Sequence, residues 1–326
     1  MPAASHDLPA VYHFRPFCNS DPPRLAEIWR SQPSQRGVMQ SVSAGLLEQF
    51  VFSKPYFDRE GLIVAEHDQC PIGFVHASFG PNEIQSTLNT HMGTTQLLML
   101  RPEHRNGGLA DELLARAEGY LRDHGAKVLY GGGIKPLNGF YLGLYGGSEL
   151  PGVLVTDSVL VDACQRNGYR EIDRVEVLHW DVSRFRMPFS REQRQLRRNV
   201  VCKETYCPPA QSWWDACTHG NFERIFFRLE QLGTERDLAH VWFWDIEPLS
   251  SSWGVPTCGM FDMYVDPEAR RHGYAAHLLN EAFDRLRRRG IVLVEAHVMQ
   301  TNAPALALYE KLGYAHVDQG IVFRKE

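Results

Sequence analysis

An arginine-containing turn in the C-terminal third of the chain has the features of an anion-binding site. It consists of Arg270, Arg271, His272, Gly273, Tyr274 and Ala275, and it leads directly into a segment with helical periodicity. The start of a helix offers unpaired backbone N–H groups and a partial positive charge, and Gly273 and Ala275 let a bulky anion approach the backbone closely. Arg270 and Arg271 add positive charge. The turn therefore predicts a site for a pyrophosphate group.

The same turn occurs twice in the chain, at an offset of 165 residues. Residues shared by the two copies are Pro102, Arg105, Gly108, Ala110, Leu113, Leu114 and Gly125 in the first, and Pro267, Arg270, Gly273, Ala275, Leu278, Leu279 and Gly290 in the second. Any two amphipathic helices can share leucines, but chance would not also align the proline, arginine, glycine and small residue ahead of them. The sequence therefore predicts an internal repeat.

Each copy of the repeat predicts the same elements: a strand, a glycine-bearing turn, an amphipathic helix and a second strand. In the second copy these are residues 259–265, 266–273, 274–289 and 291–298, and in the first copy 96–100, 101–108, 109–124 and 127–131. Gly290 is expected to end the second helix, because glycine adopts the left-handed conformation common at that position. The predicted fold class is α/β (α+β).

A chain of 326 residues exceeds what one hydrophobic core usually supports, which favours two domains. Polar residues cluster over 183–199, after a predicted strand at 175–182. We place the boundary there, giving an N-terminal domain over 1–185 and a C-terminal domain over 190–326. The arginines of this segment are interpreted as a solvated connector rather than a binding patch.

A second motif follows the C-terminal copy and reads N-x-x-A-x-x-L-Y-E-K-x-G-Y from Asn302 to Tyr314. Together with R-x-x-G-x-A in the turn, it resembles the two core motifs of the GNAT superfamily of N-acetyltransferases, in a tandem arrangement. The resemblance is close over residues 259–314, clear over about 96–125, and only architectural elsewhere.

The resemblance implies two tandem GNAT folds, each with a mixed central sheet that splays open and is flanked by helices. Backbone groups around Met263 and Val265 would pair with the pantetheine of acetyl-CoA, the turn would hold the pyrophosphate, and the thioester would lie beside Asn302 and Tyr309. The implied activity is direct transfer of an acyl group, most simply acetyl, from acetyl-CoA to a primary amine in the C-terminal domain. Two alternatives stay open: a non-catalytic acyl-CoA-binding or sensing protein, and a transferase of a longer acyl group.

The resemblance also suggests the proton-transfer groups. A tyrosine at the position of Tyr309 would protonate the departing thiolate, and a base must take a proton from the acceptor ammonium. His297 is the candidate base, at a place where several similar enzymes have glutamate, because imidazole titrates near neutrality. Glu295 shares its strand face and is the reserve. The alternatives are a hydrogen-bonded strand histidine and a packed helix tyrosine.

The first half keeps the turn but lacks a clean second motif. CoA contacts are expected from Leu98, Leu100, Arg105, Asn106, Gly107, Gly108, Leu109 and Ala110. Gly132 matches His297 and offers no base. Asn138 precedes Tyr145 by seven residues, as Asn302 precedes Tyr309, but the intervening glycines disfavour a helix there.

The Gly-Tyr ending of the motif arrives about twenty residues late in the first half, at Gly168 and Tyr169, which predicts an inserted loop over 143–160. This loop is interpreted either as an acceptor- or cofactor-binding element, with Ser148, Glu149 and Asp157 as its polar groups, or as a tolerated surface insertion. The aromatic clusters Trp213–Trp214 and Trp242–Trp244 are expected to pack in the core rather than to line an acceptor pocket.

Composition narrows the remaining possibilities. The net charge of -5 gives no electrostatic reason to expect a nucleic acid partner. No apolar stretch is long enough for a membrane helix or a secretory signal, which predicts a cytoplasmic protein. The seven scattered cysteines indicate reduced thiols, and Cys202, Cys207 and His219 are too few for a zinc site, so no metal is expected. The acceptor, a small-molecule or peptide amine, and the oligomeric state stay open.

Overall fold

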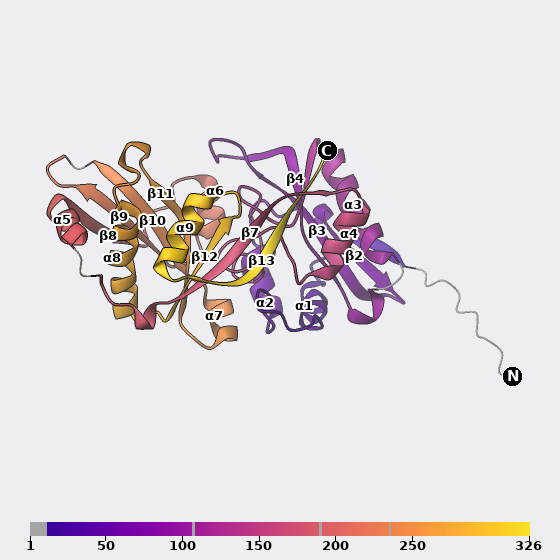
Figure 1. Ribbon diagram of the computed structural model, residues 1–326. Coiled ribbons are helices and arrows are strands. Elements are labelled where there is room, and N and C mark those ends of the chain that lie inside the picture. Colours follow the sequence, from indigo (N-terminus) through magenta and orange to yellow (C-terminus); the bar gives the residue numbers. More distant parts are fainter. Residues whose placement is uncertain (1–11, 106–107, 189–190, 235) are drawn as a thin grey trace.

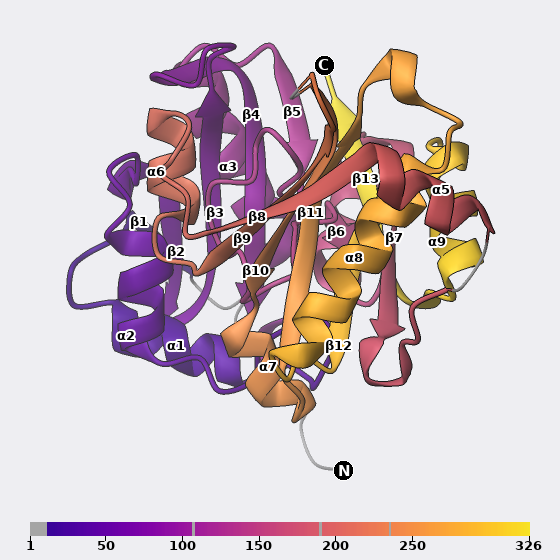
Figure 2. The ribbon, with the colours of Figure 1, turned by 90° about the vertical axis from the view of Figure 1, so that its left-hand side faces the viewer.

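The computed structural model describes residues 12–105, 108–188, 191–234 and 236–326, and within them the chain is a mixed α/β protein (Figure 1). Thirteen strands of the described residues form one sheet in the order β1-β2-β3-β4-β5-β13-β7-β12-β11-β10-β9-β8, with the short β6 paired to β13. Helices cover the sheet, and Figure 2 shows α8 lying across β9, β10 and β11. The predicted fold class is confirmed.

The strands are β1 (His13–Pro16), β2 (Leu62–His67), β3 (Cys70–Pro81), β4 (Leu88–Leu100), β5 (Val128–Gly131), β6 (Val153–Leu154), β7 (Arg170–Asp181), β8 (Val200–Tyr206), β9 (Arg224–Gln231), β10 (Asp237–Asp245), β11 (Thr257–Val265), β12 (Leu293–Met299) and β13 (Ala315–Lys325). The α-helices are α1 (Pro22–Arg30), α2 (Ala44–Leu47), α3 (Leu109–Asp123), α4 (Ser158–Arg166), α5 (Arg191–Asn199), α6 (Trp213–His219), α7 (Glu247–Trp253), α8 (Tyr274–Arg288) and α9 (Ala303–Leu312).

The internal repeat is confirmed at the level of strand register. In the first half, β4 and β5 run parallel and pair only from Met92↔Val128 to Thr95↔Gly131. In the second half, β11 and β12 pair from Thr257↔Leu293 to Met260↔Ala296, which is the same register 165 residues later. Beyond these pairs β4 and β11 continue without their partners, so each half contains a splayed pair of parallel strands.

The two turns also match. Both α3 and α8 are 15 residues long, and both begin after a glycine with a φ of 80°. This left-handed conformation is easy for glycine and strained for other residues, which explains why Gly108 and Gly273 occur at the same place in both copies.

The last strand of each half is inserted beside the splayed strands of the other half. β13, from the end of the chain, lies between β5 and β7, whereas β7 lies between β13 and β12. Figure 1 shows these two long strands side by side at the centre of the molecule. The boundary between residues 185 and 190 stays a prediction, since strand pairing crosses it in both directions.

Three large buried clusters form the core. One packs α3 and α4 on the first half of the sheet, and one packs α8 and α9 on the second half. The third joins the halves, because Trp29 and Tyr141 of the first half lie in the same cluster as Trp214 and Trp244 of the second. Trp214, Trp242 and Trp244 are all buried, but Trp213 is exposed, so the prediction that both aromatic clusters pack in the core is wrong for Trp213.

The inserted loop is not a surface feature. Of the predicted loop 143–160, residues 143–154 are buried except for the half-buried Glu149, and only residues 155, 156 and 158 are exposed. Gly143, Gly146 and Gly147 have positive φ angles that exclude a helix there. The helix of the first half's second motif is α4 instead, capped by Asp157 as α9 is capped by Asn302. The interpretation as a tolerated surface insertion is therefore wrong.

The segment between the halves also differs from expectation. Residues 191–199 form the helix α5 rather than only a solvated connector, and Arg197 of this helix pairs with Glu281 of α8 at 3.0 Å. Leu196 lies near Gly273, with a side-chain carbon 3.7 Å from the position of a Cβ on that glycine. The connector thus packs beside the turn that the sequence singled out.

Candidate active site

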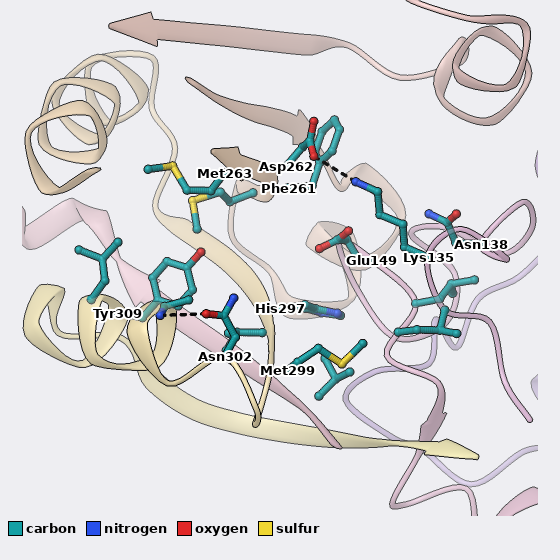
Figure 3. Close-up of a pocket in the computed structure, with 17 residues that line it drawn as sticks. Lys135, Asn138, Glu149, Phe261, Asp262, Met263, His297, Met299, Asn302 and Tyr309 are labelled. Carbon is teal, nitrogen blue, oxygen red and sulfur yellow. Dashed lines mark hydrogen bonds and ion pairs between the residues drawn. The ribbon is translucent and has the colours of Figure 1, made fainter. Parts of the chain in front are cut away.

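A cavity of about 300 Å³ lies where β11 and β12 splay apart, and we call it the splay cavity. Its walls come from β7, β11, β12, α9 and residues between 134 and 150 of the first half. Figure 3 shows the residues that matter most, namely Lys135, Asn138, Glu149, Phe261, Asp262, Met263, His297, Met299, Asn302 and Tyr309. Three predicted site residues from separate elements, Tyr309, His297 and Met263, meet at this cavity.

The helix α9 supplies the tyrosine. Asn302 caps this helix by accepting a hydrogen bond from the backbone N–H of Ala305 at 3.3 Å, which fixes the first turn. Seven residues later, Tyr309 is 5% exposed and lines the cavity, with its ring 5.2 Å from that of Tyr314. Burial raises the pKa of Tyr309, so its hydroxyl stays protonated at neutral pH and is available as a donor.

The strand β11 carries an irregularity at the mouth of the splay. Its register with β10 shifts between His240 and Trp242, and Asp262, which lies in this bulge, has a φ of 51°. The bulge turns the strand just where β12 leaves it, so the backbone around Met263 has β10 on one side only. Further along, the Val265 carbonyl accepts a hydrogen bond from Arg270 Nε at 3.2 Å.

The arginine-containing turn borders a second cavity, of about 760 Å³, between α5, α8 and α9, which we call the turn cavity. Of the predicted residues, Arg271, His272, Gly273 and Tyr274 line it, together with Lys311 of α9. Arg270 is directed back to Val265 instead, and Ala275 is half-buried in the first turn of α8. The cavity therefore offers a helix N-terminus and two cationic side chains to an anion.

The two predicted bases on β12 have different surroundings. His297 lines the splay cavity, and neither of its ring nitrogens makes a hydrogen bond within the described residues, although Nε2 lies 3.3 Å from Glu295 Oε1. Glu295 is fully buried and does not line the cavity. Of the two predicted bases, only His297 lies where it can reach a substrate in the splay cavity.

Glu295 is instead the centre of a polar contact between the halves. Its carboxylate accepts from the Ser148 backbone N–H at 2.6 Å and from His179 Nε2 at 2.8 Å, with Arg36 Nη2 at 3.4 Å. Burial alone would raise its pKa, but the interactions with His179 and His297 outweigh burial and hold the pKa well below its usual range. Glu295 is therefore an ionised structural residue rather than a base.

From the sequence, Asn138 and Glu149 were named but not placed at the site of the second half, and Lys135 was not singled out. Lys135, Asn138 and Glu149 line the splay cavity, and they also line an adjoining cavity of about 120 Å³ that we call the inter-half cavity. Further walls of this smaller cavity are Trp214, Asp215, His219, Arg224, Trp242 and Phe261. The signal available was the twenty-residue insertion, in which Glu149 had been noted as a polar group.

The matching strand end and turn of the first half contact Gln32 of the same half. Leu98 and Leu100 are buried, and the Leu100 carbonyl accepts from the Gln32 side chain at 3.1 Å. The same Gln32 accepts from Arg105 Nη2 at 2.7 Å. Leu109 and Ala110 are buried in α3, Gly108 is exposed, and Asn106 and Gly107 lie outside the described residues.

The catalytic positions of the first half are also different. The residue that follows the cap of α4 by seven positions is Cys164, where α9 has Tyr309, and burial raises the pKa of that thiol. At the position of His297 stands Gly132, where a Cβ would lie 2.3 Å from the backbone of Gly152. In the first half, Asp157 therefore corresponds to Asn302, and Cys164 corresponds to Tyr309. The match predicted from the sequence, with Asn138 and Tyr145 at these positions, is wrong.

Comparison with known proteins shows the family of both halves. The Acetyltransferase (GNAT) family matches the chain over residues 24–143 and again over residues 176–314. The chain belongs to this family. Both halves are GNAT domains, and the predicted tandem organisation is confirmed.

Individual relatives match only in part. The ribosomal protein bS18-alanine N-acetyltransferase of Salmonella typhimurium is 42% identical over 55 residues, 17% of this chain and 37% of the relative. The mycothiol acetyltransferase of Beutenbergia cavernae is 41% identical over 73 residues, 21% of this chain and 25% of the relative. A solved tandem GNAT protein from the clavulanic acid biosynthesis pathway has a TM-score of 0.64 at 13% identity, covering 97% of this chain and 98% of its own. At that identity the likeness concerns the fold alone.

Two further findings concern the described residues. None of their helices is both long and apolar enough to cross a membrane. No group of three or more histidine, cysteine, aspartate or glutamate side chains among them is arranged to hold a metal ion.

Proposed function

We propose that the protein transfers an acetyl group from acetyl-CoA to a primary amine, and that the second half is the catalytic one. The observation that carries this proposal is the difference between two otherwise matching halves. Tyr309 and His297 line an open splay cavity, whereas Cys164 and Gly132 occupy the same positions in the first half. A protein that only binds acyl-CoA would have no use for this difference.

Acetyl-CoA is the co-substrate that family membership implies, and the second half offers it a consistent set of contacts. The pyrophosphate would lie at the N-terminus of α8 beside Arg271, and the pantetheine along the unpaired edge of β11 near Met263. The thioester would then reach the splay cavity between Tyr309 and His297. The edge of β4 is also unpaired beyond Thr95, so the two halves differ at the catalytic positions rather than at this edge.

The chemistry proceeds by direct attack. The amine nitrogen forms a bond to the thioester carbonyl carbon, and collapse of the tetrahedral intermediate breaks the carbon–sulfur bond. His297 takes the first proton that the ammonium loses, directly or through a water, and Tyr309 gives a proton to the departing thiolate. The attacking nitrogen loses its second proton as the intermediate collapses, and this proton restores Tyr309. No covalent enzyme intermediate is needed.

Calorimetric titration with acetyl-CoA tests the proposal, using the wild type, Arg105→Glu, Arg270→Glu and Arg271→Glu, followed by thiol release with a panel of amines. Loss of both binding and turnover in the two second-half variants alone supports a single C-terminal site. Equal loss in Arg105→Glu would assign cofactor binding to the first half as well. Absence of acetyl-CoA binding in the wild type would refute the proposed function.

A further inference from the structure

The inter-half cavity adjoins the splay cavity, and five residues line both of them. These residues are Lys135, Asn138, Glu149, Phe261 and Asp262. Lys135 and Asn138 precede the inserted loop of the first half, Glu149 lies in that loop, and Phe261 and Asp262 belong to the bulge of β11. A molecule in the inter-half cavity therefore meets the splay cavity at Glu149 and at the Lys135–Asp262 pair.

The charges around the inter-half cavity are paired with one exception. Lys135 Nζ lies 3.0 Å from Asp262 Oδ1, and Arg224 Nη1 lies 2.6 Å from Asp215 Oδ1. No hydrogen bond or ion pair joins the Glu149 carboxylate to any other described residue. The cavity walls thus hold one more carboxylate than they hold permanently charged cations.

Glu149 stands in surroundings that disfavour an isolated negative charge. Its side chain is half-buried, and burial raises its pKa, while the neighbouring His297 and Lys135 partly offset that effect. A desolvated carboxylate without a partner is costly, and a cation placed beside it removes that cost. The cavity is therefore complementary to a positively charged group.

We infer that Glu149 binds the ammonium group of the acceptor, and that the acceptor is a small primary amine with no carboxylate beside its amino group. This inference rests on the proposed function. An amino acid would bring its carboxylate next to Glu149 and Asp262, and the two cations nearby are already held in ion pairs. A primary amine without a carboxylate brings only a positive charge, which is the partner that Glu149 lacks among the described residues.

Aromatic side chains supply the rest of the recognition. Trp214, Trp242 and Phe261 line the inter-half cavity, and the rings of Trp242 and Phe261 lie 6.0 Å apart. These walls accept the carbon skeleton of the amine, while Glu149 orients its nitrogen toward the thioester. His297 lines the splay cavity that Glu149 also reaches, so the bound ammonium lies beside the base that deprotonates it.

The loop that carries Glu149 is held in place by the second half. The backbone N–H of the preceding Ser148 donates to Glu295 at 2.6 Å, and a Cβ on Gly147 would lie 2.0 Å from the same carboxylate. Glu295 on β12 therefore positions the acceptor-binding residue relative to His297, two residues away on the same strand. The acceptor site is complete only when both halves are present.

Binding of amines to the full chain saturated with CoA tests the inference, because CoA without an acetyl group prevents turnover. Two matched pairs serve as probes, 2-phenylethylamine with phenylalanine and ethanolamine with serine, since each pair differs only by a carboxylate. We expect the wild type to bind each amine at least about tenfold more tightly than its amino acid partner. Glu149→Gln should weaken amine binding by about tenfold or more, because a charge-assisted contact is lost.

Glu310→Gln is the matched control, because Glu310 is an exposed carboxylate on the outer face of α9 that takes no part in either cavity. Unchanged amine affinity in Glu149→Gln, or amino acids that bind as tightly as the amines, would overturn the inference. The affinity for CoA is measured in the same samples. Absence of CoA binding in the wild type would refute the proposed function itself. Intact CoA binding in Glu149→Gln shows that this variant is folded.

Discussion

Replacing Glu295 by glutamine removes one negative charge from the buried contact between the two halves. The carboxylate accepts hydrogen bonds from the Ser148 backbone N–H at 2.6 Å and from His179 Nε2 at 2.8 Å, and it lies 3.4 Å from Arg36 Nη2. Glutamine has the same shape but only one oxygen acceptor, and its amide nitrogen is a donor. One of these partners must therefore lose its acceptor, and the charge of Arg36 loses its counterion.

The expected cost follows from this arrangement. Removing one member of a buried ion pair costs about 3–5 kcal/mol, because the remaining charge is left uncompensated in a poorly solvated place. Arg36 is partly exposed, with 26% of its side chain accessible, which favours the lower end of that range. We expect the free energy of unfolding to fall by about 3 kcal/mol, a large fraction of the roughly 5–15 kcal/mol typical of folded proteins.

The pH dependence of this loss has a definite sign. The pKa of Glu295 is lowered in the folded protein, so its stabilising effect is present above the pKa of an unfolded glutamate, near about 4.3, and is lost as the pH falls through the lower folded value. The difference between wild type and Glu295→Gln should be complete at pH 7. It should shrink progressively below about pH 5.

Urea denaturation followed by tryptophan fluorescence measures both effects, with Glu310→Gln as the control for an exposed carboxylate. The control should change stability by less than about 0.5 kcal/mol. A loss in Glu295→Gln no larger than in the control, or a difference that grows as the pH falls, would refute the assignment of Glu295 as a buried ionised link. We also expect weaker amine binding in Glu295→Gln, because Ser148 and the neighbouring Glu149 lose their anchor.

Two further predictions concern proton transfer and a buried lysine. Tyr309→Phe should lower kcat about 100-fold with little change in the affinity for acetyl-CoA, since the phenol acts only on the departing thiolate; stopped-time thiol release and calorimetry measure the two quantities, and an unchanged kcat would rule out the acid role. Lys54 donates to the Cys217 and Thr218 carbonyls at the end of α6, and burial lowers its pKa from 10.5 to about 8. Between pH 8 and pH 10.5 the unfolded chain therefore binds more protons at Lys54 than the folded chain does. As the pH rises over this range, the free energy of unfolding of the wild type should increase by up to about 3 kcal/mol relative to that of Lys54→Met. Urea midpoints at pH 7.5 and pH 10 measure that change, and a constant difference would contradict it.

Local patterns predicted the repeated unit well. The helix predicted over 274–289 is observed at Tyr274–Arg288, and that over 109–124 at Leu109–Asp123, because each follows a glycine whose conformation and position are local properties. Helical periodicity, the glycine turns and the pattern of the second motif act within a few residues. They were therefore readable without knowledge of any neighbour.

The exchange of β7 and β13 was not predictable in this way. Both strands are paired on their two sides, and nothing in their own residues says which half they join. The choice depends on pairing between residues more than a hundred positions apart, such as Ala315 with His179. Strand alternation identifies a strand and its buried face, but it does not identify the partner.

The sequence by itself determined the tandem GNAT layout, the turn before α8 and the positions of Tyr309 and His297, because their spacing is encoded along one short stretch of chain. Only the tertiary structure decided that Glu295 faces the other half while His297 faces a cavity, and that Glu149 of the first half reaches the site of the second. These outcomes depend on which side chains and backbone groups surround each residue. The physical reason is that burial, charge pairing and cavity shape arise from contacts between distant segments, which sequence spacing does not record.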